Sequence, residues 1–235
     1  MTRTIAIHQP NFFPWLGYFD KIARSDAFVV LDDVQHQKSG SNWTTRVQLL
    51  LGGQPRWAGA PVRRPAHGTV RIDELRWDES QPWRDKLLRS IALNYGRCAR
   101  YEQAMELIEP LVRNPQPEVA AYNLQAVRTI AEALGLRTPM VPASSFGIGH
   151  ASNERLASLV QAVGGDVYLA GGGAQGYQDA AVFQSRGIRV LAQGFRQRPY
   201  AQRGVSAFVP GLSVIDALMN VGVEGTRSLL FEGAA

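Results

Sequence analysis

The chain begins with two short apolar runs, and each of them ends in polar side chains. Ile5–Ile7 leads into His8, and the run 27–31 leads into a pair of aspartates. Each run has the length of a buried strand, and residues 17–24 between them have the pattern of a helix. This order of strand, helix and strand predicts the start of a parallel α/β sheet.

The following segments predict a hairpin and then a block of helices. Two runs with strand character flank Gly52 and Gly53, which predicts a β-hairpin at about 44–62. Imperfect alternation over 69–77 suggests one more strand. Residues 80–136 repeat apolar positions at helical spacing, and Gly135 supplies a stop signal at the end of this segment.

A second α/β segment follows the helical middle. It is expected to contain a short strand at 139–143, a helix at 152–163, a strand at 166–170, a glycine-rich turn at 171–176, a helix at 177–185, a strand at 188–192 and a last helix at 213–221. The two α/β segments together predict a mostly parallel, Rossmann-like sheet within one domain, 1–235. The hairpin and the helices are insertions in this sheet.

Composition bounds the class of protein. The chain is 45% hydrophobic and 19% charged, which is enough apolar material for a core and too little charge for disorder. The net charge of +5 favours an anionic ligand, or it reflects an arginine-rich surface, since the basic residues are scattered. A single cysteine, Cys98, excludes an internal disulfide and a cysteine-based metal cluster. No run approaches the ~20 apolar residues of a membrane span, so a cytoplasmic protein without a span is expected.

The first strand end holds the strongest candidate for catalysis. In a parallel sheet, ligands bind outside the carboxyl ends of the strands, where His8 is expected to lie. His8 is a candidate general base or hydrogen-bond donor, and the alternative is a histidine that only holds its loop. Gln9, in the loop after His8, and Tyr18, in the helix that follows, are candidate substrate-binding residues. The other aromatic residues of this segment are expected to pack in the core.

The second strand end carries Asp32 and Asp33. Neighbouring residues on a strand point to opposite sides, so one of the two carboxylates is expected to face His8, and strand position favours Asp32. Asp32 is a candidate catalytic residue that orients His8 or accepts a proton, and the alternative is a turn or capping carboxylate. Asp33 is a candidate substrate-binding residue. The sequence contains no histidine or glutamate pattern with zinc spacing, so no metal ligands are predicted.

Polar and basic residues after the aspartates could hold an anion. Gln35, Lys38 and Arg46 are candidate substrate-binding residues, of which Lys38 could act as a point charge on a phosphate or carboxylate. Solvated side chains are the alternative for all three.

The glycine-rich turn is a candidate anion site. Gly171, Gly172 and Gly173 lie between a predicted strand and a predicted helix, where free backbone N–H groups can hold an anion. The run matches neither the dinucleotide fingerprint nor the Walker loop, so an ordinary tight turn is the alternative. Tyr177 could line the same crevice. His8, Asp32 and this turn are expected to converge on one pocket.

Motifs from end to end resemble those of WbqC-like proteins. The resemblance is carried by 5–21, 31–35 with Lys38, 154–156, 168–171, 187–188, Phe195, Tyr200 and 212–220. Relatives have a Ser at the position of Ala170. A serine nucleophile at this position is therefore not expected in this chain. The resemblance implies a bacterial protein linked with surface-polysaccharide and modified-sugar biosynthesis, and it does not supply a reaction.

Three functions remain open at this level. The first is a small transferase that joins an acyl or aminoacyl group to an amine, for example on a nucleotide-activated amino sugar, with tRNA or an acyl carrier among the possible donors. The second is a nucleotidyl- or adenylate-forming enzyme with Mg²⁺ at the aspartates. The third is a non-catalytic binding protein of a polysaccharide pathway. The expected partner is an anionic or nucleotide-linked small molecule, and a nucleotide and Mg²⁺ are the cofactors under consideration.

Overall fold

A five-stranded parallel sheet forms the centre of the protein. The computed structural model describes residues 2–36, 43–63, 68–149, 151–171 and 180–231. The strands are β1 (Thr4–His8), β2 (Ala27–Val30), β7 (Met140–Pro142), β8 (Val167–Ala170) and β9 (Arg189–Ala192), in the spatial order β7-β2-β1-β8-β9. The predicted α/β class with a mostly parallel sheet is therefore confirmed.

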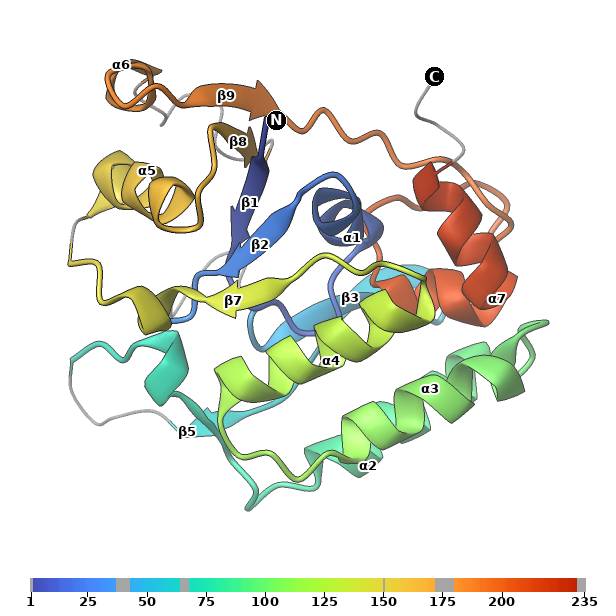
Figure 1. Ribbon diagram of the computed structural model, residues 1–235. Coiled ribbons are helices and arrows are strands. Elements are labelled where there is room, and N and C mark those ends of the chain that lie inside the picture. Colours follow the sequence, from blue (N-terminus) through green and yellow to red (C-terminus); the bar gives the residue numbers. More distant parts are fainter. Residues whose placement is uncertain (1, 37–42, 64–67, 150, 172–179, 232–235) are drawn as a thin grey trace.

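Helices cover both faces of the sheet (Figure 1). Alternate residues of β1 point to opposite faces, so Ile5 and Ile7 pack in one apolar cluster and Ala6 packs in the other. The Ile5 face is covered by α5 (Ser152–Ala162) and α6 (Ala180–Gln184). The Ala6 face is covered by α1 (Leu16–Ala23), α4 (Val119–Ala133) and α7 (Val214–Phe231). His8 lies two residues after Ala6 on β1, so its side chain points to the same face, toward α1.

The predicted hairpin and helical middle are both present. Strands β3 (Arg46–Leu51) and β4 (Gln54–Gly59) pair antiparallel, and their apolar side chains join the cluster on the α1 side. Helices α2 (Trp83–Tyr95) and α3 (Tyr101–Arg113) pack outside α4 and α7 (Figure 1).

Two local predictions were wrong. The segment 69–77 is not a continuous strand. It forms the 3₁₀ turn η1 (Ile72–Glu74) and the two-residue strand β6 (Arg76–Trp77), which pairs with β5 (Val62–Arg63). The last helix does not end at 221. It continues to Phe231 after a break at Gly222, whose φ of 73° is in the left-handed region and is not helical.

Candidate active site

The carboxyl ends of β1 and β8 form the point at which the chain changes direction across the sheet. β1 and β8 are neighbours, but the chain leaves β1 toward β2 and leaves β8 toward β9. The two strands lead to opposite sides of the sheet, and the point where they do so is the usual ligand position in open α/β sheets. His8 ends β1, and Gly171 follows β8 directly. These two predicted site residues therefore lie at the same edge.

His8 is held as a neutral imidazole. Its side chain is half-buried, its Nδ1 lies 3.2 Å from the carbonyl oxygen of Gln9, and its ring packs edge-on against Tyr18 and Trp15. Burial, reinforced by the charge of Lys21, lowers the pKa of His8 to about 3, although the bond to Gln9 opposes this change. Because a carbonyl oxygen only accepts, Nδ1 carries the proton and Nε2 keeps its lone pair. A lone pair on Nε2 is what a general base requires.

Lys21 is a site residue that the sequence analysis missed. Its side chain projects from α1, is only 2% exposed, and donates from Nζ to the carbonyl oxygen of Ile7 at 2.9 Å. A Cβ added to Gly171 would lie 3.6 Å from Nζ, so this ammonium stands between β1 and β8 at their carboxyl ends. Burial lowers the pKa of Lys21 to about 8. The lysine is therefore still cationic at pH 7.

The loop after His8 is fixed by hydrogen bonds to its carbonyl groups. The Tyr18 hydroxyl donates to Gln9 O at 3.0 Å, and burial raises the pKa of this phenol, which keeps its proton in place. The Asn123 amide donates to Pro10 O at 3.0 Å, and the Ser213 hydroxyl donates to Phe13 O at 2.6 Å. Phe13 has a φ of 42°, which is uncommon for a side chain of this size. Groups far apart in the sequence thus hold the His8 loop in one conformation.

Asp32 and Asp33 are bonded to residues other than His8. The Asp32 carboxylate accepts from Ser144 N at 3.0 Å and from Ser144 Oγ at 2.7 Å, so it holds the start of the 3₁₀ turn η2 (Ala143–Phe146). The Asp33 carboxylate pairs with Arg155 of α5. These contacts match the alternative in which the aspartates serve as capping or structural carboxylates. A catalytic role for Asp32 remains a prediction.

A metal ion does not fit these carboxylates well. Both oxygens of Asp32 are occupied by donors of Ser144, and one oxygen of Asp33 is occupied by a guanidinium. Within the described residues, no group of three or more His, Cys, Asp and Glu side chains is arranged to hold a metal ion.

The remaining predicted binding residues are distributed differently. Gln9 is half-buried beside His8, whereas Gln35 is exposed and its backbone forms an isolated antiparallel β-bridge with Arg71. Arg46 begins β3, where its guanidinium carbon lies 4.5 Å from the centre of the Trp57 ring. Four predicted residues lie outside the described residues: Lys38, Gly172, Gly173 and Tyr177.

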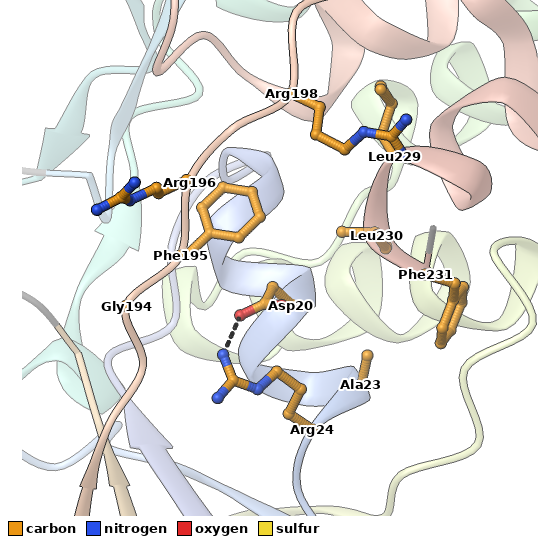
Figure 2. Close-up of a pocket in the computed structure, with 10 residues that line it drawn as sticks. All are labelled: Asp20, Ala23, Arg24, Gly194, Phe195, Arg196, Arg198, Leu229, Leu230 and Phe231. Atoms are coloured by element: carbon orange, nitrogen blue, oxygen red, sulfur yellow. Dashed lines mark hydrogen bonds and ion pairs between the residues drawn. The ribbon is translucent and has the colours of Figure 1, made fainter. Parts of the chain in front are cut away.

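A sizeable cavity lies elsewhere, on the other side of α1. It measures about 600 Å³ and is lined by α1, the segment 194–198 and the end of α7 (Figure 2). Figure 2 shows Asp20 paired with Arg24 on one wall and Phe195 on another. Tyr18 and Lys21 of α1 contact the His8 loop and β1, whereas Asp20 and Arg24 face this cavity, so the helix separates the two places.

Comparison with known proteins agrees with the motifs. The profile of the WbqC-like protein family matches residues 9–228. The chain belongs to the WbqC-like protein family. It is also 29% identical to the uncharacterized protein Rv1507c of Mycobacterium tuberculosis over 233 residues, which cover 97% of this chain and 98% of that protein. No solved structure gives a significant match.

Membership of the WbqC-like family does not by itself assign a reaction to the site. In the described part of the chain, the helices are too short or too polar to cross a membrane. Three supporting residues escaped the sequence analysis: Lys21, Asn123 and Ser213. Lys21 is one of only three lysines in the chain, and this scarcity was its one sequence signal.

Proposed function

We propose that this protein is an enzyme that transfers an acyl or aminoacyl group to an amine, with His8 as the general base. The observation that carries the proposal is the position of the His8 imidazole at the junction of β1 and β8, with Nδ1 bonded to Gln9 O and Lys21 bonded to the neighbouring Ile7 O. Two features support it: the bond from Nδ1 to Gln9 O leaves the lone pair of Nε2 to accept a proton, and a buried ammonium favours negative charge on a reacting group.

The proposed step moves one proton and exchanges one bond at the acyl carbon. The amine nitrogen of the acceptor forms a bond to the acyl carbon, and the bond from that carbon to the oxygen or sulfur of the donor breaks. The amine proton passes to Nε2 of His8 and then to the departing oxygen or sulfur. Lys21 contributes its buried charge: from its bond to Ile7 O, beside His8, this ammonium favours the negative charge that develops at the carbonyl.

The partners of this reaction are proposed by class. The donor is an activated acyl or aminoacyl group on tRNA, an acyl carrier or a nucleotide, and the acceptor is an amine such as a nucleotide-activated amino sugar. The nucleotidyl- or adenylate-forming alternative with Mg²⁺ is weaker, because the Asp32 and Asp33 carboxylates are bonded to Ser144 and Arg155.

The test is a search for the acylated product by mass spectrometry. The protein is incubated with nucleotide-linked amino sugars and with aminoacyl-tRNA, acyl-carrier thioesters or aminoacyl adenylates, with and without a chelator. We expect a product whose mass has increased by one acyl group, no effect of the chelator, and a loss of about 10²–10⁴ in rate for His8→Gln.

A second histidine supplies the matched control. His36 is buried after β2, where its backbone N–H bonds to Val70 O, and His36→Gln should keep the activity of the parent protein. Turnover that depends on added Mg²⁺ would favour the adenylate-forming alternative. Tight binding of the acceptor without any product would favour a non-catalytic binding protein.

A further inference from the structure

Three tryptophans form a continuous aromatic surface, here called the tryptophan wall, from the His8 loop to the hairpin. The ring centres of Trp15 and Trp43 are 4.9 Å apart, and those of Trp43 and Trp57 are also 4.9 Å apart. Trp15 and Trp43 are half-buried, and Trp57 is 38% exposed. The wall thus runs from the interior to the surface of the molecule.

The wall differs from the other two tryptophans of the chain. Trp77 and Trp83 are 1% and 3% exposed and pack against Phe12, as expected for core residues. Trp57 lies on β4, whose residues 54–57 are all exposed. An exposed indole beside half-buried ones adds little to the core, and grouped exposed aromatic rings are typical of binding surfaces.

The inner end of the wall touches the proposed general base. The ring centres of Trp15 and His8 are 5.9 Å apart, in an edge-on arrangement. Trp15 is held closely, because a Cβ on Gly17 would come within 2.5 Å of its Nε1. A ligand bound along the wall would therefore bring one of its ends to His8.

The outer end of the wall combines an aromatic face with a cation. The guanidinium carbon of Arg46 lies 4.5 Å from the centre of the Trp57 ring. Indoles stack on flat rings, and guanidinium groups bind phosphate oxygens. This pairing suits a ligand in which a ring is joined to a phosphate.

We propose that the tryptophan wall binds the ring of a phosphate-bearing substrate, with Trp57 and Trp43 contacting the ring and Arg46 contacting the phosphate. This inference rests on the proposed function, because it treats the wall as an extension of the site at His8. Two kinds of ligand share the chemistry: a nucleotide offers its base, and a sugar phosphate offers the apolar face of its sugar ring.

Calorimetric titration tests the wall without requiring turnover. UDP, ADP, glucosamine 1-phosphate and inorganic phosphate are titrated into the parent protein and into Trp57→Ala, Trp57→Phe and Arg46→Gln. At least one ring-bearing phosphate should bind, and Trp57→Ala should weaken its binding by roughly 5- to 100-fold, with a smaller loss for Trp57→Phe. Arg46→Gln should weaken the binding of every phosphate and reduce its dependence on salt.

Each outcome has a defined meaning. Leu93→Ala, which alters an 86% exposed side chain of α2, is the control and should bind as the parent does. Wall-dependent binding of UDP or ADP identifies a base as the ring, and wall-dependent binding of glucosamine 1-phosphate alone identifies a sugar. The inference is overturned if no ring-bearing phosphate binds, or if Trp57→Ala binds as tightly as the parent. Wall-dependent binding without acyl transfer would overturn only the proposed function.

Discussion

Replacing Lys21 with methionine should separate the stability of the protein from its activity. Lys21 is 2% exposed, and burial lowers its pKa from 10.5 to about 8. At 1.36 kcal/mol per pKa unit, keeping this lysine charged in the folded protein costs about 3 kcal/mol below pH 8. Methionine has a similar length and no charge, so Lys21→Met removes that cost together with the hydrogen bond to Ile7 O, which contributes about 1 kcal/mol.

The expected effect depends on pH in a defined direction. Between pH 8 and 10.5 the unfolded chain still binds the Lys21 proton and the folded protein does not, so the stability of the parent rises with pH in this window. At pH 7, Lys21→Met should therefore be as stable as the parent or up to about 2 kcal/mol more stable. Near pH 10 this advantage should disappear.

Urea unfolding at pH 7, 8.5 and 10 measures this difference. Lys86→Met is the matched control, because Lys86 is exposed on α2 and its substitution should leave the pH dependence unchanged. A loss of more than about 2 kcal/mol at pH 7 in Lys21→Met, equal at all three pH values, would refute the reasoning and make Lys21 a structural donor. Acyl transfer by Lys21→Met should fall although the protein stays folded, because the buried charge beside His8 is lost.

Three further predictions concern His8, its support and the C-terminal helix. The value of kcat/KM should not fall near pH 6.5, because the pKa of His8 is about 3, and it should fall near pH 8 as Lys21 loses its proton. A fall in kcat/KM on going below pH 6.5 would contradict the lowered pKa of His8. Gly17→Ala should lower the activity roughly tenfold or more and should affect the melting temperature less, because the new Cβ would come within 2.5 Å of Trp15 Nε1 and displace that ring. Unchanged kinetics would mean that Trp15 does not shape the site. Asp216→Asn should lower the free energy of unfolding in urea by about 3 kcal/mol, because the 0% exposed Asp216 carboxylate accepts from Tyr95, Tyr200 and Gln202, and an amide NH₂ would face donor groups there. A loss below about 1 kcal/mol would contradict this account.

The sequence alone predicted the parts of the fold that depend on local pattern. Short apolar runs identified β1, β2 and β8, and Gly52-Gly53 located the hairpin, because strand burial and turn geometry are properties of neighbouring residues. The position of His8 at a strand end followed in the same way. Local pattern was less informative where elements are short, as at 69–77, where hydrogen bonds to Asp32 and Pro117 support a 3₁₀ turn and a short strand instead of a longer strand.

Only the tertiary structure decided which polar groups meet. The local pattern does not mark Lys21 as buried, yet the packing of α1 on the sheet buries it between β1 and Gly171. Strand position favoured Asp32 as the carboxylate that faces His8, but it could not show that Ser144, 112 residues later, donates to both oxygens of Asp32 because β7 pairs beside β2. Strand order and helix packing bring distant residues together, and these are set by the summed burial of the whole core, which no short stretch of sequence encodes.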